Sequence, residues 1–192
     1  MVEATSSQAI LVGNPTSVRG HRTSLAVWKN FKIYSVTSNL IIATDTIQGN
    51  HVFTECPDAI SAISVYPISE NRARVAFGTE KGRVFILRLS EDGSLETDKD
   101  HQIMGGAINA LIWTPDGKAL IALGLGSAAI NPENGHGVGD ILGHAGKILC
   151  GVLNSSKTLF SAGEGLEILR HEGPPFKGQG KPIKNIHTGF VN

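Results

Sequence analysis

The feature that most constrains the fold is a hairpin pattern that occurs three times in the sequence. In its clearest copy, two apolar runs, Ile108–Trp113 and Ala119–Leu125, flank a Thr-Pro-Asp-Gly turn at 114–117. Pro115 presets φ and Gly117 accepts a positive φ, so this tetrapeptide favours a turn. Apolar runs this short, bounded by Gly or Pro, predict β-strands rather than helices. Both runs are apolar on both faces, which is typical of a sheet packed between two other sheets.

The same pattern appears at Ala59–Gly78 and, one residue shorter at the turn, at Lys147–Gly163. A period of roughly 40–50 residues with several strands per repeat is the signature of a propeller blade. The sequence therefore predicts an all-β, partial β-propeller of about four blades, with approximate limits 14–56, 57–100, 101–142 and 143–192. Within the second blade we expect the strands Ile60–Tyr66, Arg74–Phe77 and Arg83–Leu89, and we expect His101–Met104 to open the third.

Composition narrows the class of protein. Of the 192 residues 41% are hydrophobic, enough for an ordinary domain core, and 17 basic residues balance 17 acidic ones. This balance argues against nucleic acid or an anionic membrane as the main partner, because both favour a basic surplus. Cys56 and Cys150 lie far apart in the sequence, so a disulfide framework is not expected. No apolar run approaches the ~20 residues of a membrane span, and the first residues do not resemble a signal sequence. We therefore expect a cytoplasmic protein.

One motif favours a different class of function. Residues 124–129 satisfy G-x-G-x-x-A, the dinucleotide-binding pattern, directly after an expected strand. That site needs a following helix whose N-terminus holds the pyrophosphate. Here Asn131–Gly135, with Pro132 inside it, interrupts any helix after about one turn. A nucleotide-dependent enzyme is thus an alternative, and a plain glycine-containing loop is the favoured interpretation.

Gly143 and His144 precede the expected strand Ile148–Leu153. This dipeptide, at this place in a blade, is typical of WD repeats, where the histidine usually bonds within the blade. We therefore interpret His144 as structural rather than catalytic or metal-binding. The Trp-Asp ending of these repeats is absent, so the His–Ser–Asp–Trp network of the family is degenerate here. None of the seven histidines has partners spaced as in a zinc site.

The last part of the chain carries a more specific resemblance. Glu172–Lys177 reads EGPPFK, and the segment 187–192 reads HTGFVN. Together with AINALIWTPDG at 107–117 and VGDILGH at 138–144, these motifs resemble the actin-interacting protein 1 family, the WD-repeat cofactors of ADF/cofilin. The resemblance spans most of the chain, and EGPPFK is its most specific motif.

The resemblance implies a non-catalytic protein without cofactor or metal that binds actin filaments together with ADF/cofilin, promotes filament disassembly and acts at the cytoskeleton. It places the actin/cofilin contacts on the side chains Glu164, Phe176, Lys177 and Phe190. Two family contacts are missing, an aromatic residue at Gly178 and an acidic residue at Leu125. From the residues alone, Phe176 could equally pack inward, and Glu164 could be an ordinary turn carboxylate.

The alternative to an actin-regulatory module is a general WD-repeat scaffold that binds other proteins without actin activity. The family propeller has seven blades, so this chain is expected to form an open arc, a truncated product or gene fragment that is marginally stable or oligomeric alone. Ile148, Val152 and Leu153 are expected near the open end of that arc, where exposed edges and apolar faces favour association.

Overall fold

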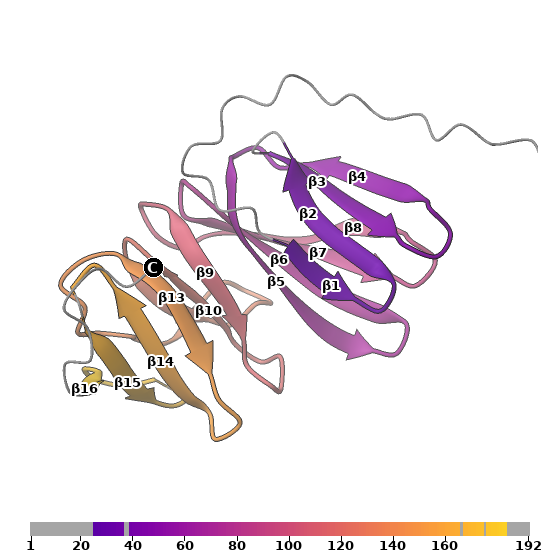
Figure 1. Ribbon diagram of the computed structural model, residues 1–192. Coiled ribbons are helices and arrows are strands. Elements are labelled where there is room, and N and C mark those ends of the chain that lie inside the picture. Colours follow the sequence, from indigo (N-terminus) through magenta and orange to yellow (C-terminus); the bar gives the residue numbers. More distant parts are fainter. Residues whose placement is uncertain (1–24, 37–38, 166, 175, 184–192) are drawn as a thin grey trace, which may run out of the picture.

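The computed structural model describes residues 25–36, 39–165, 167–174 and 176–183. These residues form sixteen strands and no helix. The strands make four antiparallel sheets of four strands each, which follow one another in chain order (Figure 1). This architecture is a partial WD-repeat β-propeller, and it confirms the fold class predicted from the repeats.

Each sheet is a simple meander in which consecutive strands pair. The first sheet consists of β1 (Leu25–Trp28), β2 (Phe31–Val36), β3 (Leu40–Asp45) and β4 (His51–Glu55). The second consists of β5 (Ile60–Ser69), β6 (Arg72–Thr79), β7 (Arg83–Ser90) and β8 (Leu95–Gln102). The third consists of β9 (Ile108–Trp113), β10 (Leu120–Gly124), β11 (Ser127–Ile130) and β12 (Gly137–Gly139). The fourth consists of β13 (Ile148–Leu153), β14 (Thr158–Gly163), β15 (Ile168–Glu172) and β16 (Lys181–Ile183).

The turn predicted at 114–117 forms as expected between β9 and β10. The N–H of Gly117 donates to the carbonyl of Thr114 at 2.9 Å, and Gly117 has φ +65°. The Asp116 carboxylate accepts the Thr114 hydroxyl at 2.7 Å, which lowers the pKa of that carboxyl together with the Lys118 N–H bond. The turn of the hairpin is thus held by its own main chain and side chains.

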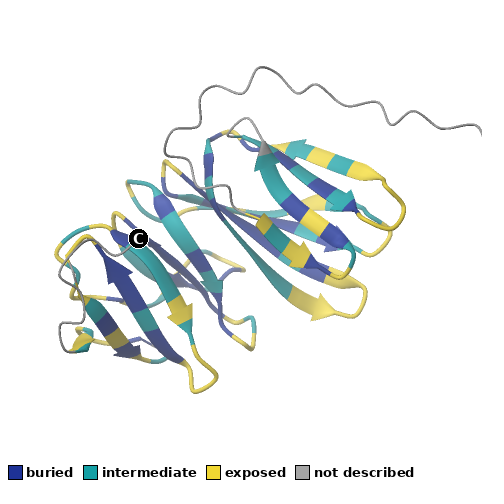
Figure 2. Cartoon of the chain, viewed as in Figure 1, coloured by how far each residue is buried: buried dark blue, intermediate teal, exposed yellow. Residues whose placement is uncertain are grey.

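The core consists of three apolar layers, one between each pair of neighbouring sheets. The second sheet contributes Val75 and Phe77 to the layer shared with the first sheet, and Ala76 and Ile86 to the layer shared with the third. Every residue of β10 is buried, as expected for a strand apolar on both faces (Figure 2). The inner strands β1, β5, β9 and β13 lie next to one another and bring the sheets into an arc.

The expectation that His101–Met104 opens the third blade is wrong. His101 and Gln102 are the last residues of β8, which closes the second sheet by pairing with β7. Its sequence, LETDKDHQ, is rich in charged residues and lacks the apolar alternation by which the other strands were predicted. In the structure Asp98 at the middle of this strand is paired, because its carboxylate accepts Arg88 at 2.7 Å and Arg74 at 3.1 Å.

Two smaller expectations concern the apolar residues. Both cysteines are free; Cys56 is buried, which raises the pKa of its thiol, whereas Cys150 is half-buried.

Of the residues expected near the open end of the arc, Val152 is exposed, but Ile148 is 3% exposed because its side chain faces the third sheet. The expected blade limits at 14 and 192 fall outside the described residues.

Candidate functional site

The candidate site lies on the fourth sheet, in the turn between β14 and β15. The N–H of Glu164 donates to the carbonyl of Lys147 at 3.0 Å, and Oε2 of Glu164 accepts the N–H of Lys147 at 3.3 Å. The Lys147 ammonium lies 4.0 Å from the other carboxylate oxygen. With 43% of its side chain exposed, Glu164 is held in one place and still faces solvent. Its carboxylate is therefore available to a partner.

The same turn position recurs on the two preceding sheets. The N–H of Glu80 donates to Ala59, and the N–H of Leu125 donates to Ala107, as Glu164 does to Lys147. In the third sheet this position carries Leu125, whose side chain is 59% exposed. These hydrogen bonds thus align the three repeats at this position and show that an apolar side chain replaces the carboxylate on one of them.

Phe176 lies in the connection between β15 and β16 and is 1% exposed. It belongs to the apolar layer between the third and fourth sheets, together with Ile121 and Leu159. Its carbonyl accepts the N–H of Asp140 at 3.0 Å, which ties the connection to the segment after β12. The side chain therefore packs inward and is not available to a partner in this conformation.

The other two expected contacts are placed differently. Lys177 follows Phe176 directly and is exposed, whereas Phe190 lies outside the described residues. Glu164 lies at the end of β14, directly after its last residue. The connection that carries Phe176 begins after Glu172, and Glu172 pairs with Thr158, the first residue of β14. Glu164 and Phe176 thus belong to opposite ends of one sheet, and the structure does not bring them together.

A polar network inside the fourth sheet confirms the structural role expected for His144. Nε2 of His144 lies 2.7 Å from the Ser161 hydroxyl, and the same hydroxyl lies 2.9 Å from Nε2 of His171. Ser161 and His171 are almost fully buried. His171 therefore serves as the third member of a network that WD repeats usually complete with tryptophan.

The proton positions in this network follow from one unpaired atom. Nδ1 of His171 is buried and has no hydrogen-bond partner, so a proton there would be an unsatisfied buried donor, which costs about 1–3 kcal/mol. The proton of His171 therefore sits on Nε2 and is donated to Ser161, whose hydroxyl donates to His144. Burial lowers the pKa of both histidines, and each of them is neutral in this arrangement.

Sequence reasoning missed His171, because nothing distinguishes a lone histidine in the segment Ile168–Glu172. A signal was nevertheless present. The residue falls on a strand where the repeat pattern expects a buried side chain with one N–H donor, and an imidazole offers such a donor as an indole does.

The nucleotide-binding alternative does not fit the geometry at residues 124–129. Ser127–Ile130 forms strand β11, which pairs with β10, so no helix N-terminus follows the glycines. The α-carbon of Gly124 also lies against the carbonyl of Ala107, where an added Cβ would collide. Gly124 thus serves the close approach of two strands, and the segment is not a nucleotide-binding loop.

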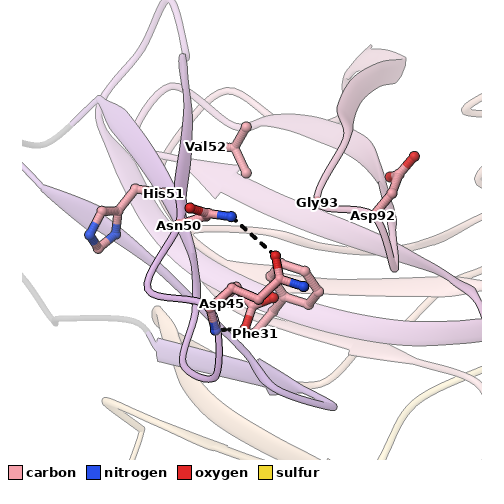
Figure 3. A pocket seen from close by; sticks show the side chains of 8 residues that line it. Phe31, Asp45, Asn50, His51, Val52, Asp92 and Gly93 are labelled. Atoms are coloured by element: carbon pink, nitrogen blue, oxygen red, sulfur yellow. Dashed lines mark hydrogen bonds between the residues drawn. The ribbon is translucent and has the colours of Figure 1, made fainter.

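A small cavity of about 100 Å³ lies between the β3–β4 turn and the β7–β8 turn (Figure 3). The Asp45 carboxylate on its wall accepts the backbone N–H groups of Ile47 and Gln48, and the bond from Gln48 is the main cause of the lowered pKa of Asp45. Asp92, across the cavity, accepts the N–H of Ser94. Both carboxylates are therefore occupied in stabilising turns.

Within the described part of the chain, no group of three or more histidine, cysteine or acidic side chains is placed to hold a metal ion. The same residues include no helix long and apolar enough to cross a membrane.

Comparison with known proteins bears on the function. No family model matches the sequence. Actin-interacting protein 1-2 of Arabidopsis thaliana is 29% identical over 131 residues, covering 65% of this chain and 21% of that protein. Actin-interacting protein 1 of Drosophila melanogaster is 24% identical over 183 residues, covering 92% of this chain and 30% of that protein. The chain is similar to actin-interacting protein 1. It spans less than a third of the length of these relatives.

A solved structure supports the fold independently of these relatives. Sqt1 from Chaetomium thermophilum superposes with a TM-score of 0.68 at 14% identity, and the match covers 88% of this chain and 49% of that one. At this identity the likeness concerns the fold alone.

Proposed function

We propose that this chain is a non-catalytic, actin-binding WD-repeat module of the cytoplasm that acts with ADF/cofilin in filament disassembly. The observation that carries the proposal is the similarity to the fly actin-interacting protein 1, which extends over 92% of the chain. The plant relative, actin-interacting protein 1-2, matches 65% of the chain. Filaments are the expected partner, and the cytoskeleton the expected location.

The side chains that support this proposal lie on the fourth sheet. Glu164 presents a carboxylate that is fixed by the main chain and yet 43% exposed, and fixing a contact residue before binding reduces the entropy lost on association. Lys177 presents an exposed ammonium group at the opposite end of the sheet. Phe176 supports the proposal indirectly, because its burial anchors the connection that carries Lys177.

The experiment is co-sedimentation of the chain with actin filaments, with and without ADF/cofilin. The proposal predicts more chain in the pellet when ADF/cofilin decorates the filament. Replacing Glu164 by Ala should weaken this cofilin-dependent binding several-fold. The matched control is Glu80→Ala, which changes the same turn position on the second sheet and should leave the binding unchanged.

A single observation favours the alternative, a WD-repeat scaffold without actin activity. Leu125 is 59% exposed at the turn position where the resemblance places an acidic contact. A scaffold that binds another protein through this row of turns would use an exposed apolar side chain there. Absence of the chain from filament pellets under both conditions would favour the scaffold over the actin-binding module.

A further inference from the structure

Each sheet of this arc has a leading face, directed toward the preceding sheet, and a trailing face, directed toward the following one. The three apolar layers all have one construction, in which the trailing face of one sheet packs on the leading face of the next. Among the described residues two faces are left uncovered, the leading face of the first sheet and the trailing face of the fourth. One uncovered face of each type is therefore present.

The uncovered leading face carries an apolar row that crosses all four strands of the first sheet. Leu25 lies opposite Tyr34, Tyr34 opposite Ile42, and Ile42 opposite Phe53. Leu25 is 59% exposed, Phe53 is 65% exposed, and the neighbouring Val27 is 61% exposed. The exposed positions on β1 and β4 are visible in Figure 2. Side chains of this kind are buried or half-buried where another sheet of the chain covers them.

The uncovered trailing face belongs to β13–β16. Val152, 60% exposed, lies opposite Phe160 on the neighbouring strand. A second row is formed by Ile168 and Ile183, which pair on β15 and β16 and are both half-buried. Arg170 lies opposite Phe160 and Lys181 lies opposite Arg170, so the row that begins at Val152 ends in charged side chains on the outer strands. The face thus has an apolar inner half and a polar outer rim, as interfaces between proteins commonly have.

We propose that the two uncovered faces bind each other between two copies of this chain, so that the trailing face of each copy packs on the leading face of the other. The contact repeats between copies the packing that the chain already uses three times internally. Such a contact is heterologous, and it forms a closed ring when the rotation between copies closes.

The size of the arc points to two copies. The described residues of each copy form four sheets, so two copies supply eight, which lies at the upper end of the four to eight blades of propellers. The arc also matches 49% of the length of Sqt1, so two such arcs amount to about the whole of that chain. A two-membered ring leaves neither face exposed to water.

The first test is the mass of the full chain in solution, measured by sedimentation equilibrium over a range of concentrations. We expect a reversible species of twice the 20.3 kDa of one chain. A monomer at all concentrations overturns the proposal. It would mean that the uncovered faces are satisfied within the chain or by another protein.

The second test uses a matched pair of substitutions. Val27 and Val152 lie on the inner strands of the two uncovered faces and are 61% and 60% exposed, so Glu at either place should not disturb folding, which circular dichroism checks. Val27→Glu and Val152→Glu should each abolish the dimer, because each removes one partner from both contacts of the ring. Ile47→Glu, in an exposed turn at 82% exposure, is the control that should leave the dimer intact.

The two variants also distinguish this dimer, in which unlike faces meet, from a dimer in which like faces meet. An equimolar mixture of Val27→Glu and Val152→Glu retains one intact contact, so association should reappear at higher concentration than in the parent chain. A dimer in which like faces meet would respond to only one of the two substitutions. Loss of association in one variant and not the other therefore overturns the proposal.

Discussion

The hydroxyl of Ser161 lies 2.9 Å from Nε2 of His171, inside a sheet and away from water. The same hydroxyl also bonds His144, from the connection that enters the sheet. The hydroxyl oxygen of Ser161 is thus the shared atom of a network that joins three segments of the fourth sheet. Because the network is enclosed, its contribution to stability can be measured by changing one residue or by changing the pH.

Replacing Ser161 by Ala should lower the free energy of unfolding by about 2 kcal/mol, because it leaves ring nitrogens of His144 and His171 without a partner. The measurement is the midpoint of urea unfolding at neutral pH. Ser156→Ala, in the exposed β13–β14 turn, is the control and should change the midpoint little. Equal effects of the two substitutions would show that the network contributes nothing.

Acid should destabilise the fold in a specific window. Burial lowers the pKa of His144 and His171 below 6.5 in the folded chain, so the unfolded chain binds more protons as the pH falls past 6.5. Stability contributed by these two groups is present above pH 6.5 and is lost as the pH falls from there through their lowered pKa values. Unfolding midpoints measured between pH 7.5 and 5.5 should decrease, and the double substitution of both histidines by Gln should flatten that decrease.

Gly163 at the end of β14 should be sensitive to a single methyl group. An added Cβ there would collide with the carbonyl of Lys147, so Gly163→Ala should destabilise the chain by roughly 1–3 kcal/mol. Gly165→Ala, two residues further in the same turn, has open space around its Cβ, with Ala145 N no nearer than 4.0 Å. Thermal melts of the two variants provide the comparison, and similar melting temperatures would contradict the packing argument.

The fold could be predicted because its signal is local and repeated. The hairpin around Pro115 contains its own turn chemistry, and its copies at Ala59–Gly78 and Lys147–Gly163 required the same structure. Strand β8 escaped prediction because its stabilisation is not local. In the sequence alone, Asp98 and Asp100 resemble solvated surface charges. Their arginine partners lie on β6 and β7 and come close to them only in the folded sheet.

The candidate site was less predictable, because exposure is decided by packing between sheets. The motif Glu172–Lys177 gave no means to choose between an inward and an outward Phe176, and the contact with Ile121 and Leu159 makes it inward. The exposure of Glu164 was easier to predict, because a carboxylate in a turn between two short strands has few ways to be buried. His171 depended on Ser161, which lies ten residues away on another strand.

Glu80, Leu125 and Glu164 make the same main-chain hydrogen bond. At this position the main chain stabilises the turn, and the side chain faces solvent. The main chain of this position closes the turn by bonding to the preceding connection, whichever side chain it carries. The side chain can therefore be acidic or apolar while this main-chain bond is kept, and at Glu164 the carboxylate adds a second bond, to the N–H of Lys147. The chemical character of the exposed side chain thus differs from one turn to the next along this arc, while the main-chain bond beneath it stays the same.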